Sequence, residues 1–365
     1  MWFSRLRETL LLSTAAVRAT RRLQHSDSAR RLTVREQCGG IRTITLNNPR
    51  KRNALCLNML SSLREDLLTD MDSEELRVII IAANGPVFSS GHDLKELTPA
   101  QGREYHHQVF TVCAEVMTLI QDHPVPVMAK VNGIATAAGC QLVASCDIVV
   151  ATETSTFATP GVNVGLFCST PAVAIGRTVP RKVAMEMLIT GAPISAHDAM
   201  RHGLVSKVVP AEKLEEETLL IAQRVCEASR PVIALGKATF NRQMAQGRDA
   251  AYCIASAAMV DNLALKDGQE GIKAFLEKRK PVWANSREKA YKCAPRSAQS
   301  TGARAPHGTR RGAGPSDRRS GAAHLSAVAA GRVRHRGGVQ RTSLPRFVCF
   351  NNISVPAGAM EEGLI

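Results

Sequence analysis

The chain has 365 residues, 44% of them hydrophobic, which is enough apolar sequence for one large domain or two smaller ones. Its net charge of +15 would suit a nucleic-acid or anionic-membrane partner if the basic residues were evenly spread. They lie instead at the two ends: residues 1–31 carry seven Arg against two acids, and residues 284–365 carry fourteen Lys and Arg against four. The rest of the chain is neutral, which favours an enzyme or binding domain with basic ends.

The first 31 residues are rich in Arg and Ser and nearly free of acids. On a helix, Leu6, Leu10 and Val17 would share a broad face, with arginines largely away from it. This composition is typical of a mitochondrial transit peptide, and we expect the protein in the matrix. A disordered tail or a weak secretory signal is the alternative, but the apolar run is short and arginines continue beyond it. No run approaches the ~18 apolar residues that a membrane span needs.

Strand and helix patterns alternate through the first half of the folded part. Alternating or continuous apolar residues predict strands, and apolar residues at helical spacing predict helices. Strands are predicted over residues 41–46, 78–82, 125–131 and 148–151, and helices over 57–71, 105–121 and 140–145. This alternation favours an α/β architecture.

Beyond Pro180 the pattern is mainly helical, with one short strand over 205–209. Helices are predicted over residues 182–188, 195–202, 211–229, 231–244 and 250–265. We therefore divide the chain into a core (32–210), a C-terminal helical region (211–283) and a basic tail (284–365). The tail is rich in Arg, Gly, Ala, Ser and Pro, a disordered composition, and it lacks the interleaved aromatics that stack on bases, so no nucleic-acid partner is predicted.

No metal or disulfide is predicted. The ten cysteines show no CxxC or other paired spacing, and most of them lie in apolar runs. Such cysteines are typical of reduced core residues in a compartment that keeps thiols reduced. The histidines have no ligand-like spacing to carboxylates.

Two motifs carry a family resemblance. Residues 85–97 read GPVFSSGHDLKEL, and residues 131–147 read VNGIATAAGCQLVASCD. They resemble the crotonase (enoyl-CoA hydratase/isomerase) superfamily, in which the second segment reads roughly VNGxAxGGGCELAxxCD. NNPRKRNAL, FATPGVNVGL, TGAPISAHDAMRHGLVSKVV and the GQEGIKAFLEKRKP helix fit the same family in the same order, so the resemblance covers residues 32–283.

The resemblance implies a ClpP/crotonase-like spiral of β-β-α units with a C-terminal helical trimerisation region. It also implies a homotrimer or hexamer, and an acyl-CoA thioester as substrate or ligand, with no permanently bound cofactor. In the family, two backbone N–H groups donate to the thioester oxygen. The resemblance places these two donors at His92 and Ala138. Two fixed donors suit a developing oxyanion, and a helix beginning near Ala138 adds partial positive charge.

The resemblance places the two hydratase glutamates at Gln141 and Gly161. An amide holds water but does not exchange a proton usefully near neutral pH, and glycine supplies no group at all. A positioned acid or base typically contributes about 10²- to 10⁴-fold. We therefore expect no ordinary enoyl-CoA hydratase activity, and we expect hydration to rise only when both carboxylates are restored.

Three alternatives remain open. The GHD turn resembles the acyl-CoA decarboxylase branch, where a histidine at the His92 position acts beside the oxyanion donors; the imidazole could instead cap a turn or bind Asp93 or a backbone group. The protein could equally be a non-catalytic acyl-CoA-binding regulator. Cys168 is a candidate nucleophile, although buried packing is the favoured interpretation. Residues 167–170 contain no carboxylate of the kind that isomerases of the family use.

Four basic residues are candidates for CoA contacts by the same resemblance. Lys51 and Arg52 follow a strand where the family contacts the CoA phosphates or adenine. Lys95 lies just past the first motif, and Lys278 in the closing helix is a candidate for the 3′-phosphate. Any single lysine is more often a solvated charge. Together these features predict a mitochondrial acyl-CoA-binding protein of fatty-acid metabolism.

Overall fold

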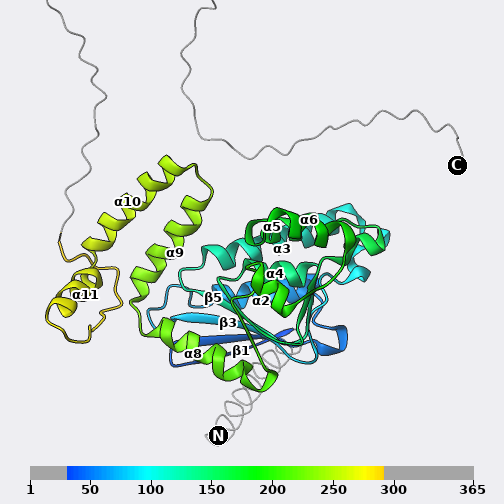
Figure 1. Ribbon diagram of the computed structural model, residues 1–365. Helices are drawn as coiled ribbons and strands as arrows, with labels where there is room; N and C mark the ends of the chain where they lie inside the picture. Colours follow the sequence, from blue (N-terminus) through cyan, green and yellow to red (C-terminus); the bar gives the residue numbers. More distant parts are fainter. Residues whose placement is uncertain (1–30, 292–365) are drawn as a thin grey trace, which may run out of the picture. The chain divides into compact units, whose positions relative to one another are not determined.

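The strands of residues 31–291, the part that the computed structural model describes, form two sheets (Figure 1). The larger has the order β1-β2-β3-β5-β7-β10 and the smaller the order β4-β6-β8-β9. The strands are β1 (Thr33–Cys38), β2 (Ile41–Leu46), β3 (Val78–Ala83), β4 (Val87–Ser89), β5 (Val127–Val131), β6 (Ile134–Thr136), β7 (Ile148–Thr152), β8 (Thr156–Ala158), β9 (Ile194–Ser195) and β10 (Lys207–Val209).

Helices cover the sheets and form the C-terminal region. The α-helices are α2 (Leu57–Leu68), α3 (Gly102–Asp122), α4 (Ala138–Ser145), α5 (Ser169–Thr178), α6 (Arg181–Thr190), α7 (Ala196–Arg201), α8 (Leu214–Cys226), α9 (Arg230–Met244), α10 (Arg248–Ala264) and α11 (Lys266–Leu276). Short 3₁₀ turns are η1 (Pro49–Lys51), η2 (Leu94–Leu97), η3 (Pro99–Gln101), η4 (Pro160–Val164) and η5 (Ala211–Lys213).

Every strand and helix predicted from the pattern is present; β2 has the predicted ends, and each of the others has at least one shifted end. The pattern missed β1, β4, β6, β8, β9 and α5. β4, β6, β8 and β9 have two or three residues, too few to show alternation. β1 has six, but its sequence, TVREQC, is mostly polar and its side chains are mostly exposed. α5 carries Pro171 and Gly176, which weaken a helical pattern. Pro171 is tolerated because it lies in the first turn of the helix.

The larger sheet is covered on both faces, which explains why β3 is apolar without interruption. Val78 and Ile80 pack in one cluster with Leu214 and Ala222 of α8. The alternate residues of β3, Ile79 and Ile81, face the other side of the sheet and pack in the main core with α2, α3 and α4. Figure 1 shows α8 on the opposite face of the sheet from these three helices.

A repeat of strand, strand and helix builds the fold. In the units β3-β4-α3, β5-β6-α4 and β7-β8-α5, the first strand joins the large sheet and the second joins the small sheet. This confirms the predicted spiral of β-β-α units. Because β4, β6 and β8 pair in parallel, the segments that follow them leave the small sheet at the same edge. Those segments contain His92, Ala138 and Gly161.

The ordered C-terminal region extends beyond the predicted boundary. The tail was predicted to begin at residue 284, but the N–H of Ala284 donates to Asp267 Oδ1 at 2.8 Å and that of Ala290 to the Ala264 carbonyl at 2.8 Å. Leu265 also forms a β-bridge with Lys289. Residues 284–291 therefore belong to the helical region, because α10 and α11 offer them hydrogen-bond partners. Residues 1–30 of the predicted transit peptide (1–31) and residues 292–365 of the tail lie outside the described residues.

Two properties of the described residues bear on other classes of protein. None of their helices combines the length and the apolar character needed to cross a membrane. Nor do residues 31–291 bring together three or more His, Cys, Asp or Glu side chains in a group able to hold a metal ion.

Candidate acyl-thioester site

The turn after β4 packs directly against the start of α4. Gly91 has φ +83°, and a Cβ there would lie 2.7 Å from the Cβ of Ala137 and 3.1 Å from the nitrogen of Ala138. On α4, a Cβ on Gly139 would lie 2.5 Å from the Ser89 carbonyl oxygen. Both glycines are therefore needed for this close approach of two backbones.

Ala137, the residue before α4, holds an unusual backbone conformation. Its φ is 51° and its ψ is −119°, a region that residues with a Cβ rarely adopt. Its N–H donates to the Ala158 carbonyl at 2.9 Å, and its carbonyl accepts from the N–H of Gln141 at 3.0 Å. Strain of this kind costs on the order of 1–3 kcal/mol and persists only where neighbouring contacts impose it.

Two backbone donors remain free at this junction. Within the described residues, neither the N–H of His92 nor that of Ala138 donates to a protein acceptor. Ala138 is the first residue of α4, so its N–H has no partner within the helix. The helix also places partial positive charge here. Such an arrangement can stabilise a carbonyl oxygen that gains negative charge.

These donors border a cavity of about 530 Å³. Its wall is mostly apolar, and among the described residues that line it there is no Asp, Glu, Lys or Arg. Several apolar side chains at its rim are exposed, including Leu94, Val164 and Phe167. The lining residues are Ser90, His92, Leu94, Leu97, Phe110, Ala137, Ala138, Pro160, Gly161, Asn163, Val164, Leu166, Phe167, Cys168, Ser169, Thr170 and Pro171.

His92 is held by a residue far away in the sequence. Its Nδ1 lies 3.1 Å from the carbonyl oxygen of Leu55, while the N–H of Leu55 donates to the Gly91 carbonyl at 2.8 Å. The imidazole meets the ring of Phe110 edge to face, with 5.2 Å between centroids. Burial lowers the pKa of His92, while the Leu55 hydrogen bond acts in the opposite direction. The ring is therefore neutral at pH 7. The sequence indicated neither Leu55 nor Phe110 as part of the site. Leu55 is the last residue of the NNPRKRNAL segment, outside the predicted helices and strands, and Phe110 lies within the helix predicted over residues 105–121.

Gly161 lines the cavity, but its surroundings leave no room for a side chain. A Cβ there would lie 2.5 Å from the Leu166 carbonyl oxygen and 2.8 Å from Cys168 Sγ. Residues 161–168 fold back on themselves, and the N–H of Leu166 donates to the Gly161 carbonyl at 2.9 Å. Burial raises the pKa of the Cys168 thiol, so the structure supports packing over a nucleophilic role for this residue.

Gln141 lies on α4, one turn after Ala138, and is 4% exposed. Its Oε1 is buried and accepts no hydrogen bond within the described part of the chain. It does not line the cavity with His92, Ala138 and Gly161. The structure therefore brings three of the four predicted site residues together around one space.

Three of the four predicted CoA contacts lie beside the same turn. The Arg52 carbonyl accepts from the N–H of Ser90 at 3.0 Å, and Lys51 Nζ lies 3.4 Å from Asp93 Oδ2. Lys95 donates its N–H to Asp93 Oδ1 at 3.1 Å. Lys278 differs: it follows α11, which packs against α9 and α10 rather than against the elements that line the cavity.

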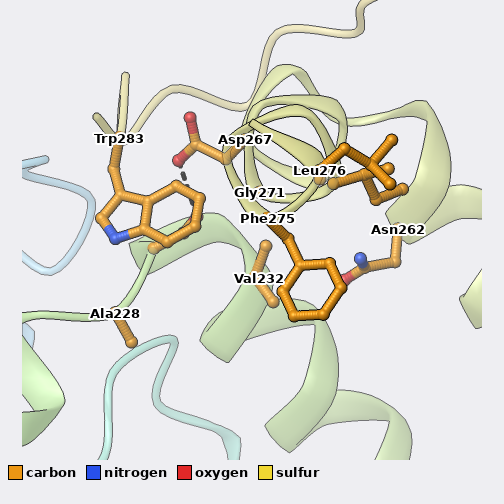
Figure 2. A pocket seen from close by; sticks show the side chains of 11 residues that line it. Ala228, Val232, Asn262, Asp267, Gly271, Phe275, Leu276 and Trp283 are labelled. Carbon is orange, nitrogen blue, oxygen red and sulfur yellow. Dashed lines mark hydrogen bonds between the residues drawn. The ribbon is translucent and has the colours of Figure 1, made fainter. Parts of the chain in front are cut away.

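A second cavity, of about 460 Å³, lies between α9 and α11 (Figure 2). Figure 2 shows Val232, Phe275 and Trp283 around it, with Asp267 at one side. Trp283 Nε1 donates to the Glu227 carbonyl at 2.7 Å, and Asp267 Oδ2 accepts from Ser229 Oγ at 2.6 Å. The two cavities share no lining residue.

The spiral of β-β-α units, with two free backbone donors at a strand-to-helix junction, defines a protein of the crotonase fold. The chain belongs to the enoyl-CoA hydratase/isomerase family, whose family model matches residues 36–286. This confirms the resemblance seen in the two motifs.

Relatives and solved structures agree with this assignment. The chain is 67% identical over 276 residues to "Enoyl-CoA hydratase domain-containing protein 3, mitochondrial" of Danio rerio, an alignment that spans 76% of this chain and 96% of the relative. The crystal structure of the human protein of that name matches with 66% identity and a TM-score of 0.69, over 69% of this chain and all of that one. An enoyl-CoA hydratase structure from Mycobacterium smegmatis matches with 46% identity and a TM-score of 0.68, over 69% and 98%. The mitochondrial names of the relatives agree with the compartment predicted from the first 31 residues.

Proposed function

We propose that the protein is a mitochondrial acyl-CoA-binding protein of fatty-acid and lipid metabolism, in which the N–H groups of His92 and Ala138 hold the thioester oxygen. The observation that carries this proposal is the pair of free backbone donors beside an apolar cavity of about 530 Å³. The donors suit the carbonyl, and the apolar wall suits an acyl chain, which gains about 0.8 kcal/mol for each buried CH₂.

The proposal does not include ordinary hydration of a double bond. Hydration needs a group that takes a proton from water and a group that delivers one to carbon. Gln141 and Gly161 supply neither, and no Asp or Glu belongs to the described lining of the cavity. The protein then either catalyses a reaction that needs only oxyanion stabilisation or binds acyl-CoA without turning it over.

A decarboxylase-like reaction with His92 is the catalytic alternative. It requires a carboxylate in the cavity, but the His92 ring is neutral and no Lys or Arg belongs to the described lining. This charge pattern favours the binding function. Release of CO₂ from methylmalonyl-CoA by the wild-type protein, lost in His92→Ala, would instead favour the decarboxylase.

The CoA moiety is proposed to lie along the turn after β4, beside which Lys51, Arg52 and Lys95 carry positive charge. Lys278 is proposed as a CoA contact only through a neighbouring subunit, since α11 packs against α9 and α10 in its own chain.

We propose a homotrimer or hexamer because the last three helices expose large apolar side chains. Isolated apolar residues are normal on a surface, but a series over adjacent helices is typical of an interface. The exposed residues on and just after these helices include Phe240, Met244, Tyr252, Met259, Val260, Ile272, Phe275, Leu276 and Val282.

Calorimetry with the full-length protein tests the proposal. The ligands are butyryl-CoA, octanoyl-CoA, free CoA and S-butyl-CoA, a thioether that lacks the carbonyl oxygen. We expect butyryl-CoA to bind roughly 30-fold more tightly than S-butyl-CoA, because two hydrogen bonds of about 1 kcal/mol each, about 2 kcal/mol together, are lost. Equal affinities would contradict the role of the two N–H groups. No heat with any acyl-CoA would contradict acyl-CoA binding as a whole.

A further inference from the structure

The chain contains two Asn-Gly pairs, Asn84-Gly85 and Asn132-Gly133. Each asparagine directly follows a strand of the large sheet, β3 or β5, and both asparagines are exposed. The two glycines have similar backbone conformations, with φ +89° at Gly85 and +83° at Gly133. Sequence and local conformation therefore do not distinguish the two pairs.

The backbone N–H of the glycine distinguishes them. The N–H of Gly133 donates to Ser155 Oγ at 3.1 Å, and Ser155 is 1% exposed. The N–H of Gly85 donates to no acceptor within residues 31–291, and Gly85 is exposed. A buried N–H that moves away from its acceptor loses a hydrogen bond, whereas a free one moves without this loss. Only the nitrogen of Gly85 is therefore free to approach a neighbouring group.

The neighbouring group that can react is the side-chain amide of the preceding asparagine. The glycine nitrogen forms a bond with Cγ, the Cγ–Nδ2 bond breaks, and Nδ2 leaves as ammonia with the proton that the glycine nitrogen gives up. Water then opens the succinimide ring. Addition of water at the side-chain carbonyl gives aspartate, and addition at the main-chain carbonyl gives isoaspartate, in which the chain runs through Cβ and Cγ. Glycine favours this attack because it has no side chain to hinder its nitrogen.

The amide of Asn84 is accessible to this reaction. Its Nδ2 donates to Asn47 Oδ1 at 3.0 Å, a hydrogen bond between two exposed side chains that does not involve the nitrogen of Gly85. Water replaces such an exposed bond at little cost. We propose that Asn84 is a site of spontaneous deamidation in the folded protein, and that the hydrogen bond from Gly133 to Ser155 protects Asn132 from the same reaction.

The modified turn has contacts that it cannot keep. A Cβ on Gly85 would lie 2.8 Å from Pro49 Cβ, so the turn has no spare room on that side. The Asn84 carbonyl accepts from Nδ2 of Asn53, a fully buried residue, at 2.9 Å. Isoaspartate adds a methylene to the main chain at this place and converts that carbonyl into a carboxylate. The product should therefore unfold more easily than the original protein.

Incubation of the full-length protein at physiological pH and temperature tests the inference. Mass spectrometry of the tryptic peptides 78–95 and 131–177, with fragmentation to locate the site, measures the replacement of NH₂ by OH, and an isoaspartate-specific methyltransferase detects the isomer. We expect Asn84 to deamidate at least about 5-fold faster than Asn132, which corresponds to about 1 kcal/mol, the net contribution of one hydrogen bond. In guanidinium chloride, where the bond to Ser155 is absent, the two rates should become similar.

Variants assign the difference to the two glycine N–H groups. Ser155→Ala removes the acceptor, so Asn132 should deamidate faster while the rate at Asn84 stays the same. In Asn84→Gln, whose longer side chain does not form the same ring, the urea midpoint should stay constant during incubation, whereas that of the wild-type protein should fall.

Equal rates at Asn84 and Asn132 in the folded protein, or an Asn84 that remains unmodified, would overturn the inference. So would a rate at Asn132 that Ser155→Ala leaves unchanged. The wild-type comparison alone decides the question if Ser155→Ala does not fold. A constant urea midpoint in wild-type protein modified at Asn84 would overturn the predicted loss of stability. These measurements involve no acyl-CoA, so they succeed or fail independently of the proposed function.

Discussion

The Sγ of Cys168 leaves too little space for a side chain on Gly161, because a Cβ built on Gly161 would lie only 2.8 Å from it. Sequence comparison with the family suggests a missing glutamate at Gly161. In three dimensions that position is also closed, because the loop that follows η4 fills the space.

Gly161→Ala should therefore destabilise the protein by about 1–3 kcal/mol, as overpacking does. Cys168→Ala in the same chain should recover part of this loss and give a coupling of about 0.5 kcal/mol or more in a double-mutant cycle followed by urea unfolding. Recovery is partial because the Leu166 carbonyl also lies 2.5 Å from the added atom. Gly176→Ala on α5, where nothing lies within 4 Å, is the control and should not destabilise. An unchanged stability in Gly161→Ala would contradict the packing argument.

Hydration of crotonyl-CoA should be close to background in the wild-type protein, since the loss of a positioned acid or base lowers a rate by about 10²- to 10⁴-fold. The sequence suggests that Gln141→Glu with Gly161→Glu restores hydration. The structure changes this expectation: a glutamate at 161 displaces the loop 161–168, so we expect the double variant to remain near background too. Loss of absorbance of the enoyl thioester measures the hydration rate of the wild-type protein and of the double variant. Hydration at ordinary enzyme rates in the wild type would contradict the missing-acid argument.

His123 should make the stability depend on pH. It is 1% exposed; its Nε2 lies 3.1 Å from the Leu67 carbonyl, and its Nδ1 accepts from the N–H of Val125 at 3.2 Å. Burial, with nearby Lys237 and Arg42, lowers its pKa to about 4. The folded protein therefore binds a proton at His123 only near pH 4, whereas the unfolded chain binds one there near pH 6.5. Stability should fall by about 3 kcal/mol as the pH drops from 6.5 to 4 and stay level above 6.5 on this account.

Urea unfolding at pH 7 and pH 4.5 measures this slope. His123→Gln should be less stable at pH 7 and should lose most of the slope, because no group at that place then titrates. An unchanged slope in His123→Gln would assign the acid sensitivity to other groups.

Lys237 joins α9 to the body of the fold. Its Nζ, 8% exposed as a side chain, donates to Asp147 Oδ2 at 2.6 Å, to the Ile120 carbonyl at 2.9 Å and to the Val125 carbonyl at 3.2 Å. Lys237→Met leaves Asp147 largely buried without its cation and should cost about 3 kcal/mol in urea unfolding. The exposed pair of Lys213 and Glu216 offers the matched comparison: Lys213→Met should cost less than about 1 kcal/mol. Similar losses in the two variants would contradict the buried role of Lys237.

Phe275 on α11 is 83% exposed. If the last helices contact other copies of the chain, Phe275→Asp should introduce a charge into an apolar interface and reduce the mass of the assembly in sedimentation velocity. Lys182→Asp, an exposed change on α6, should leave the mass unchanged. A wild-type protein that sediments as a monomer, or a Phe275→Asp variant of unaltered mass, would contradict the proposed assembly.

Sequence alone determined the fold class and the backbone part of the site. The two motifs lie where strands end and turns or helices begin. Glycines and small residues are required there because two backbones approach each other closely. Most of the longer strands and helices were visible because their apolar period is contained in a few successive residues. The exceptions were β1, which is mostly exposed, and α5, which contains a proline and a glycine. The three-residue strands β4, β6 and β8 were not, because only pairing with one another defines them.

Only the tertiary structure decided the properties of the side chains. The Nδ1–H tautomer of His92 depends on Leu55, 37 positions earlier, and the closed space at Gly161 depends on a loop that folds back onto it. Lys278 matched the family pattern, yet α11 packs against α9 and α10 and not against the cavity. A motif specifies which residue types are available, whereas their protonation, accessibility and partners follow from contacts that form only when distant segments pack together.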